Sequence, residues 1–438
     1  MEYDSVFENM TELSSSTENY STFVTMYIKL LFFQITQPAI FHGGVIMQAL
    51  LHCCCGLDIH KDIIQACILK GAPDEEPLII QNEFKTLQSD LQLLCKWLLD
   101  NDCRNIAMES TGVYWRPVYE AIEDYIPDFT CLMVVNAHHM RNLPGRKSDI
   151  ADAQWISTLL RHGLLEPSFV PERLIRSLRE YSRLHRSLVQ ERATYSNRVE
   201  KYLQTNGFKL SSVLSNILGI SGRNILHKLA QNGSLSFEDV KDSINRNVRK
   251  TAEEIHIAIC GKLNYAERKY LKLLLDKIDG LDTEISEILT LMLELASPYK
   301  IQLDQLDSIP GIDVSAALAI IAETSASPHN HFSNDKKIIS WAGLSPRNDE
   351  SAGKVKSRKI TKGNPYIKSI LCQVAWAAVR TRGSNFAVWF WSHQGKLGRK
   401  KAIIAVARKI LALIYRLLKS GEFYDPIVAL KPIQSQVQ

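Results

Sequence analysis

The sequence predicts an α/β domain followed by a mainly helical region. Between residues 52 and 162, short apolar or β-rich segments alternate with segments in which apolar residues recur at helical spacing. Beyond Gly163, long stretches carry apolar residues three and four apart, which is typical of helices that pack against one another. At 438 residues the chain is long enough for two or three domains, each with its own core.

The order of the predicted elements narrows the fold of the first domain. Three successive strands, close enough to pair as an antiparallel meander, are predicted at HCCCGLDIH, IIQACILK and PLIIQNEF. They are followed by a helix over FKTLQSDLQLLCKWLLD, a strand at RNIAMES, a helix over YWRPVYEAIEDY, a strand at FTCLMVVNA and a helix over SDIADAQWISTLLRHG. This is the order of an RNase H-like mixed sheet, in which the first and fourth strands lie side by side at the centre.

Four carboxylates are predicted to meet at one edge of that sheet. Asp58 lies on the first strand, Glu109 ends the fourth, and Asp149 and Asp152 share one face of the opening of the last helix. Capping by Ser148 and the helix dipole explain Asp149 but not Asp152. An isolated Asp58 would be buried without a partner, whereas Glu109 alone is equally well explained as a solvated acid at a strand end. Together the four acids predict a site for two divalent cations that act on a phosphodiester.

Two heptad-like seams predict long paired helices in the second half. The first runs from Leu174 to Tyr202 with polar interruptions, and the second runs from Leu274 to Leu295 without one. They predict a helical coiled-coil insertion, either antiparallel within the chain or formed between chains, with a helical subdomain at residues 205–250. A seam of this kind is explained by packing, and we assign no chemistry to it.

The C-terminal region is predicted to be mainly helical and strongly basic. LDSIPGIDVSAALAIIAE is similar to half of a helix-hairpin-helix, but Asp313 stands where a second glycine is usual, so we favour a plain helix–turn over a phosphate contact. A loop-rich basic segment follows it. From Ser351 to Gly421 there are sixteen Lys and Arg and no acid, which predicts a polyanionic partner such as nucleic acid. Four aromatic residues could stack on bases but are more often core at helical spacing: Trp376, Trp389, Phe390 and Trp391.

The composition of the first 46 residues and the pattern of cysteines predict the compartment in which the protein works. The first 46 residues are acidic and polar at first, and their apolar run is interrupted by Lys29 and too short to span a bilayer. We expect them to be a disordered extension or an upstream-start artefact. Nine cysteines without metal-ligand spacing predict buried thiols in a reducing compartment, the cytoplasm of a bacterial or archaeal host, without membrane contact. The predicted divisions are 1–46, 47–165, 166–300, 301–425 and a tail at 426–438.

Several motifs together carry a resemblance to a known family. From about Met47 to Tyr424, the chain resembles the DEDD transposases of the insertion-sequence-110 group, relatives of the Piv and MooV invertases, in GLDIHK, AMESTGVYW, LPGRKSDIADAQWISTLLRHGLL, IPGI and GLSPRNDESAGKVKSRKITKGN. The resemblance implies a RuvC-like N-terminal domain, a coiled-coil insertion and a C-terminal transposase domain. It also implies Mg²⁺ at the four acids, as two ions with Mn²⁺ as a substitute. For some members it implies an element-encoded RNA that bridges donor and target DNA.

The resemblance further implies a serine nucleophile in the last domain. Ser351 in ESAGK matches the family motif, with Ala352 in place of one glycine, and Ser345 and Ser357 are nearby competitors. From the residues alone, Ser-Ala-Gly is ordinary turn chemistry. Because the acids and the serine lie in separate domains, we expect a homo-oligomer, a dimer or a tetramer, that completes the site between subunits. Nucleic-acid contacts are expected from Arg146, Lys147, Lys354, Lys356, Arg358, Lys359 and Lys362.

Three other functions compete with DNA recombination. A RuvC-like structure-selective endonuclease needs the acids but forms no covalent intermediate. An actin-like sugar kinase also begins with an aspartate-bearing strand, but the sequence shows no later glycine-rich phosphate loops. A nucleic-acid-binding protein without catalysis would retain the acids only as remnants, and metal binding at the four acids would exclude it.

Overall fold

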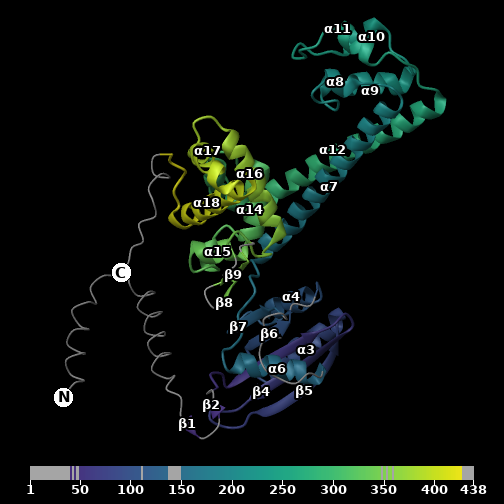
Figure 1. The fold of residues 1–438 in the computed structure, drawn as a ribbon. Helices are drawn as coiled ribbons and strands as arrows, with labels where there is room; N and C mark the ends of the chain where they lie inside the picture. The colour runs from purple at the N-terminus through teal and green to yellow at the C-terminus, as the bar shows by residue number, and fades with distance from the viewer. Residues whose placement is uncertain are drawn as a thin grey trace. The chain divides into compact units, whose positions relative to one another are not determined.

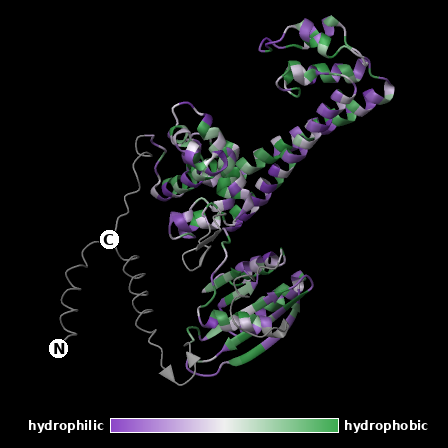
Figure 2. Ribbon diagram, viewed as in Figure 1, coloured by the Kyte–Doolittle hydropathy of each residue, from purple (hydrophilic) through white to green (hydrophobic). Residues whose placement is uncertain are grey.

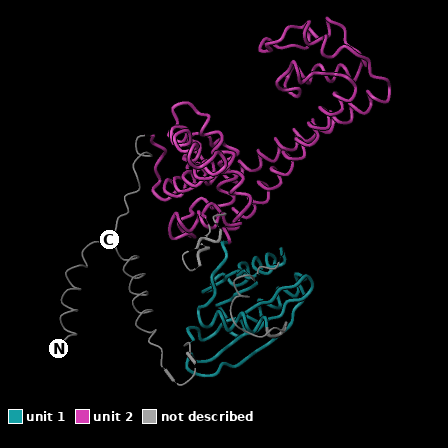
Figure 3. The backbone as a smooth tube through the Cα atoms, viewed as in Figure 1, with its two compact units in different colours: residues 1–169 teal, residues 170–438 magenta. Residues whose placement is uncertain are grey.

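The chain forms two compact units, Met1–Phe169 and Val170–Gln438 (Figure 3). The computed structural model describes residues 40–41, 44–45, 49–109, 112–136, 149–346, 349–351, 354–357 and 360–426. Most of the predicted extension and nearly all of the predicted tail lie outside these residues. The predicted regions 166–300 and 301–425 fall together in the second unit, except for residues 166–169, which belong to the first.

The first unit is built on a mixed five-stranded sheet (Figure 1). Its strands are β3 (Cys53–Ile59), β4 (Ile63–Lys70), β5 (Leu78–Lys85), β6 (Asn105–Glu109) and β7 (Cys131–Val135). They lie in the order β5-β4-β3-β6-β7, antiparallel from β3 to β5 and parallel from β3 to β7. The first and fourth strands of the predicted series, β3 and β6, are therefore neighbours at the centre, and the sheet is compatible with an RNase H-like domain. A pair of two-residue strands, β1 (Ile40–Phe41) and β2 (Gly44–Val45), precedes it.

Three helices accompany the sheet, and their burial explains their sequences. They are α3 (Gln88–Asp100), α4 (Trp115–Tyr125) and α6 (Asp149–Arg161). In α3 the buried residues Leu91, Leu94, Cys95 and Leu98 recur at the three- and four-residue spacing of one helix face. The central strand β3 is buried from Cys54 to Ile59, and a strand covered on both faces reads as a continuous apolar run. A charged residue such as Asp58 is therefore unusual in this strand.

The second unit contains two long helices that run antiparallel within the chain (Figure 1). They are α7 (Arg173–Thr205) and α12 (Tyr265–Leu295). The Tyr202 hydroxyl donates to the carbonyl oxygen of Glu267 at 3.0 Å, and further along the pair Arg192 binds Asp282. Figure 2 shows hydrophilic and hydrophobic residues interleaved along both helices. The two predicted seams therefore belong to helices that pair with each other inside one chain.

Further helices, and one β-hairpin, lie at the two ends of this pair. Between α7 and α12 the chain forms α8 (Leu210–Val213), α9 (Ile220–Asn232), α10 (Phe237–Ser243) and α11 (Ala252–Ala258), which share one apolar core with α7 and α12. After α12 it forms η1 (Ser297–Tyr299), α13 (Lys300–Asp307), α14 (Val314–Thr324), η2 (Pro328–Asn330), α15 (Asp335–Trp341), β8 (Asp349–Ser351), β9 (Lys354–Ser357), α16 (Pro365–Arg380), α17 (Asn385–Leu397) and α18 (Arg399–Ser420).

In the segment between α14 and α16, which the sequence predicts to be loop-rich, the structure has the short helix α15 and a β-hairpin. Strands β8 and β9 pair antiparallel, with Ser351 opposite Lys354. The sequence did not indicate these two strands, because strands of three and four residues are too short for their alternation to show.

All nine cysteines are free thiols, but the expected burial holds for only five of them: Cys54, Cys55, Cys67, Cys95 and Cys103. Cys260 is exposed, and the other three are partly buried. In the part of the chain that the structure describes, no helix is both long and apolar enough to cross a bilayer.

Candidate active site

Helix α6 lies directly on the central strand of the sheet. A Cβ atom on Gly56 would lie 2.3 Å from the carbonyl oxygen of Ala153 and 2.5 Å from the amide nitrogen of Ser157, so only glycine permits this approach. The Gly56 amide donates to the Ser157 hydroxyl at 2.6 Å. At the C-terminal end of α6, the Arg161 carbonyl accepts a hydrogen bond of 2.8 Å from the amide of Leu50, which lies shortly before β3. The helix therefore runs antiparallel to β3, and its first turn lies over the carboxyl end of the strand.

That arrangement brings three of the four predicted acids toward one another. Strand register pairs Leu57 with Met108, so Asp58 and Glu109 are the next residues along two parallel neighbours. Asp152 lies in the first turn of α6, over the same end of β3. Asp58 itself is only 4% exposed. Burial raises the pKa of the Asp58 carboxyl, and the negative charges of Glu109 and Asp152 raise it further. The mutual effect of these acids is the electrostatic signature of a negatively charged site.

His60 is a site residue that sequence reasoning missed. Its Nε2 atom lies 3.1 Å from Oδ2 of Asp58, and this contact opposes the rise in the carboxyl pKa. The predicted strand HCCCGLDIH placed His60 two residues after Asp58, and residues two apart on a strand point to the same face. In the structure β3 ends at Ile59, and His60 follows it directly. His60 is half-exposed, whereas the carboxylate that it contacts is buried.

The donor chemistry of this site fits a hard divalent cation. Carboxylate oxygens are the ligands that Mg²⁺ uses in proteins, and a cation would relieve the repulsion acting on Asp58. Among the residues described here, no three carboxylate, imidazole or thiol groups are gathered closely enough to hold a metal ion on their own. Asp149 begins α6, but its side chain lies outside the described atoms.

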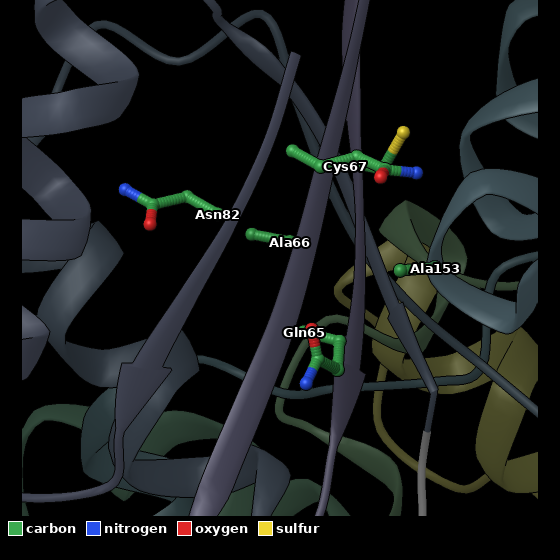
Figure 4. A pocket seen from close by; sticks show the side chains of 6 residues that line it. Gln65, Ala66, Cys67, Asn82 and Ala153 are labelled. Atoms are coloured by element: carbon green, nitrogen blue, oxygen red, sulfur yellow. The ribbon is translucent and has the colours of Figure 1, made fainter. Parts of the chain in front are cut away.

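A small pocket adjoins the acids on the β4 side. It has a volume of about 200 Å³ and is lined by Gln65, Ala66, Cys67, Gln81, Asn82 and Ala153 (Figure 4). Gln65 is the register partner of Asp58, and Ala153 follows Asp152 in the chain. The pocket therefore marks the surface of the sheet next to the carboxylates.

The structure places the predicted serine on the β-hairpin of the second unit. Ser351 is the last residue of β8, and Ser357 is the last residue of β9. Lys354 and Lys356 lie on β9, and Lys362 is exposed after it. The side chains of the hairpin lie outside the described atoms, as do Arg146, Lys147, Arg358 and Lys359 altogether.

Helix capping explains the aspartate at position 313, in the helix–turn before the hairpin. Asp313 caps α14, and its carboxylate accepts the Ala316 amide at 2.7 Å. A Cβ atom on Gly311 would lie 2.5 Å from the amide nitrogen of Ala378, so the turn packs against α16. Asp313 therefore occupies its position as an N-cap, in agreement with the plain helix–turn interpretation.

Cations cover two indole rings at the C-terminal helices. The Arg399 guanidinium lies 5.0 Å from the Trp376 ring, and the Lys409 ammonium lies 5.0 Å from the Trp389 ring. Trp376 also packs edge-on against Phe390, which is fully buried. These tryptophans hold cations in place, and an indole covered in this way offers less surface for stacking on a base.

A mixed sheet with acidic residues at one end, followed by a basic helical region, is compatible with a transposase. Family models support this in two places: a model described as "Transposase" matches residues 55–206, and one described as "Transposase IS116/IS110/IS902 family" matches residues 303–388. The chain belongs to the IS110 family of transposases.

Two relatives from Sinorhizobium fredii are similar over shorter stretches. "Putative transposase y4rJ" is 30% identical over 108 residues, which are 23% of this chain and 27% of the relative. "Putative transposase y4pF/y4sB" is 29% identical over 125 residues, which are 27% of this chain and 32% of the relative. The matched part thus spans about a third of these relatives or less.

Proposed function

We propose that the protein cuts and rejoins the DNA of an insertion sequence, using a carboxylate site for divalent cations and a serine nucleophile. The observation that carries the proposal is the interaction of Asp58, buried on β3, with the charges of Glu109 and Asp152. Family membership supports DNA as the substrate. The proposed cation ligands are Asp58, Glu109, Asp152 and Asp149.

The carboxylates act by holding positive charge where a phosphodiester reacts. Mg²⁺, as two ions, or Mn²⁺ in its place, would supply charge that offsets the scissile phosphate and favours a deprotonated nucleophile. The burial of Asp58 keeps water from screening the site, so charges act strongly there. His60 holds one oxygen of Asp58 and thereby restricts the orientation of the carboxylate.

Ser351 is the proposed nucleophile for cleavage. Its Oγ forms a bond to the scissile phosphorus and loses its proton, while the bond from phosphorus to the 3′-oxygen breaks and that oxygen takes up a proton. The product is a phosphodiester between the serine and the DNA 5′ end, together with a free 3′-hydroxyl. A 3′-hydroxyl from another strand reverses the step and joins new partners, so the number of phosphodiester bonds is conserved.

The partners follow from the same proposal. The basic residues of the hairpin and the helices after it would bind the backbone of the element ends and the target DNA. An element-encoded RNA is proposed as the guide that selects these DNA sequences. A homo-oligomer would bring the carboxylates of one subunit to the hairpin of another.

The test is cleavage of supercoiled element-junction DNA with co-expressed element RNA and Mg²⁺, quenched in detergent to keep any protein–DNA ester. Wild type is compared with Asp149→Ala, Ser351→Ala and the control Ser357→Ala. The proposal expects an adduct that is lost in the first two variants and kept in the control. Cleavage that needs Asp149, survives without Ser351 and leaves no adduct would instead identify a structure-selective endonuclease.

A further inference from the structure

The segment that carries Ser351 leaves and re-enters the helical unit at two crossing glycines. Gly343 and Gly363 have φ angles of +71° and +49°, in the region that favours glycine. A Cβ atom on Gly363 would lie 2.2 Å from the amide nitrogen of Gly343, and a Cβ atom on Gly343 would lie 2.8 Å from the carbonyl oxygen of Lys362. The two backbones are therefore in direct contact, and they close the base of the segment.

Backbone pairing continues from this crossing toward the serine. The Thr361 amide donates to the Ser345 carbonyl at 3.2 Å, and Pro346 and Ile360 form an antiparallel bridge. Strands β8 and β9 then pair up to Ser351. The serine thus lies at the end of a two-stranded stalk, so its position depends on how the base of the stalk is held.

A buried carboxylate fastens that base to two other helices. Asn364, directly after Gly363, donates from Nδ2 to Oε2 of Glu323 at 2.8 Å. Glu323 lies in the last turn of α14 and is 1% exposed. Arg183 of α7 donates to both of its carboxylate oxygens, at 2.8 and 3.0 Å. The base of the stalk is therefore linked through one carboxylate to α14 and α7.

The contacts around Glu323 satisfy its buried charge. A bidentate arginine–carboxylate pair is among the strongest polar contacts in proteins. Arg179, one turn earlier on α7, donates to the main-chain oxygens of Ala322 and Glu323 at 2.9 and 3.0 Å. The Arg183 guanidinium also lies 4.0 Å from the ring of Tyr366 in α16. These contacts fix the carboxylate that receives the Asn364 amide.

The link to Glu323 is separate from the capping role of Asn364. Its Oδ1 accepts the Tyr366 amide at 2.8 Å and so caps α16. Serine caps helices about as well as asparagine, but it has no side-chain amide group to take the place of the Nδ2 donor. A serine at position 364 would therefore keep the cap and lose the link.

We propose that Glu323 and Asn364 are positioning residues that hold the Ser351 stalk in place for attack on DNA. This inference rests on the proposed function insofar as Ser351 is the nucleophile. Lys354 and Lys356 lie on strand β9 of the stalk, so trypsin reports how often the segment opens, independently of any reaction with DNA.

The experiment compares full-length wild type, Asn364→Ser and a matched control, Asn264→Ser. Asn264 caps α12: its Oδ1 accepts the Glu267 amide, and its own main-chain amide donates to the Glu267 carboxylate. Trypsin cleavage between residues 354 and 359 is followed by mass spectrometry, and adduct formation is measured over a range of DNA concentrations. We expect Asn364→Ser to be cut about tenfold faster, because it loses one hydrogen bond to a charged group. We expect Asn264→Ser to be cut at the wild-type rate.

For the DNA reaction we expect Asn364→Ser to lower the maximal rate of adduct formation while DNA affinity stays unchanged. Unchanged trypsin cleavage of the stalk would overturn the proposal. Faster cleavage of the stalk with an unchanged adduct rate would also overturn it, because the link would then be structural only. If wild type forms no adduct, the serine mechanism fails, and the positioning role fails with it. The trypsin comparison would still decide whether the stalk is held through Asn364.

Discussion

The Nε2 atom of His60 lies 3.1 Å from Oδ2 of Asp58, so a half-exposed imidazole contacts the buried carboxylate at the centre of the candidate site. The contact lowers the pKa of a carboxyl that burial and two neighbouring acids raise. His60 therefore favours the ionised form of Asp58, which is the form that binds a cation.

Asp58→Asn should stabilise the protein in the absence of divalent cations. A carboxyl whose pKa is raised by folding stabilises the folded state below its ordinary pKa, and this contribution is lost as pH rises through the raised value. At neutral pH the asparagine removes a buried charge and its repulsion, and we expect the melting temperature to rise by roughly 2–4 °C. With millimolar Mg²⁺ wild type should gain stability and the variant should not. A lower melting temperature for Asp58→Asn without Mg²⁺ would contradict this.

His60→Gln should move the acid limb of the pH–activity profile to higher pH. The proposed mechanism requires ionised Asp58, and the pKa of this carboxyl rises when the imidazole is removed. DNA cleavage measured from acid to neutral pH gives the midpoint of the limb. His52→Gln, at an exposed histidine before the same strand, is the control and should leave the midpoint in place. Equal midpoints for all three proteins would show that Asp58 does not set the limb.

Gly56→Ala should separate α6 from β3. The added methyl group would meet backbone atoms of Ala153 and Ser157, so urea denaturation should show a loss of about 3 kcal/mol, and cleavage should be lost as Asp152 moves away from Asp58. Gly280→Ala is the matched control, because Gly280 lies within α12 and a Cβ atom there would meet nothing within 4 Å. That change should stabilise by about 0.5–1 kcal/mol. Equal effects of the two substitutions would count against the close approach.

Arg399→Gln should weaken the salt dependence of DNA binding. Arg399 lies over Trp376, in a stretch of chain without acids, so its charge is available to a backbone phosphate. Fluorescence anisotropy with duplex DNA at several KCl concentrations should give a log–log slope smaller by about 0.9 for one lost phosphate contact. Lys272→Gln is the control, since Lys272 is paired with Asp276 at 2.6 Å. A slope identical to wild type would place the DNA elsewhere.

The sheet and the long helices could be predicted from sequence because their patterns are long and local. Strands β3 to β7 and helix α6 follow the periods of apolar residues, and the pairing of β3 with β6 follows from the order of elements. The same order of elements predicts four acids at one end of the sheet, and the structure brings three of them, Asp58, Glu109 and Asp152, toward one another.

The remaining features depend on contacts between distant parts of the chain. Ser157 approaches Gly56 across 101 residues, and Arg183 binds Glu323 across 140 residues, so no local pattern marks either contact. The Ser351 hairpin escaped prediction because its strands are too short to show alternation. His60 was visible in the strand period, but its contact with Asp58 is a matter of side-chain orientation.

The most direct test of the serine mechanism is to locate the DNA on the protein. The detergent-trapped adduct is trimmed with nuclease, digested with trypsin and analysed by mass spectrometry. Trypsin separates the three candidate serines, because Ser345, Ser351 and Ser357 fall in peptides 338–347, 348–354 and 357–358. We predict a nucleotide mass on peptide 348–354, which would identify Ser351. A nucleotide on either of the other peptides, or complete cleavage without any adduct, would contradict the account.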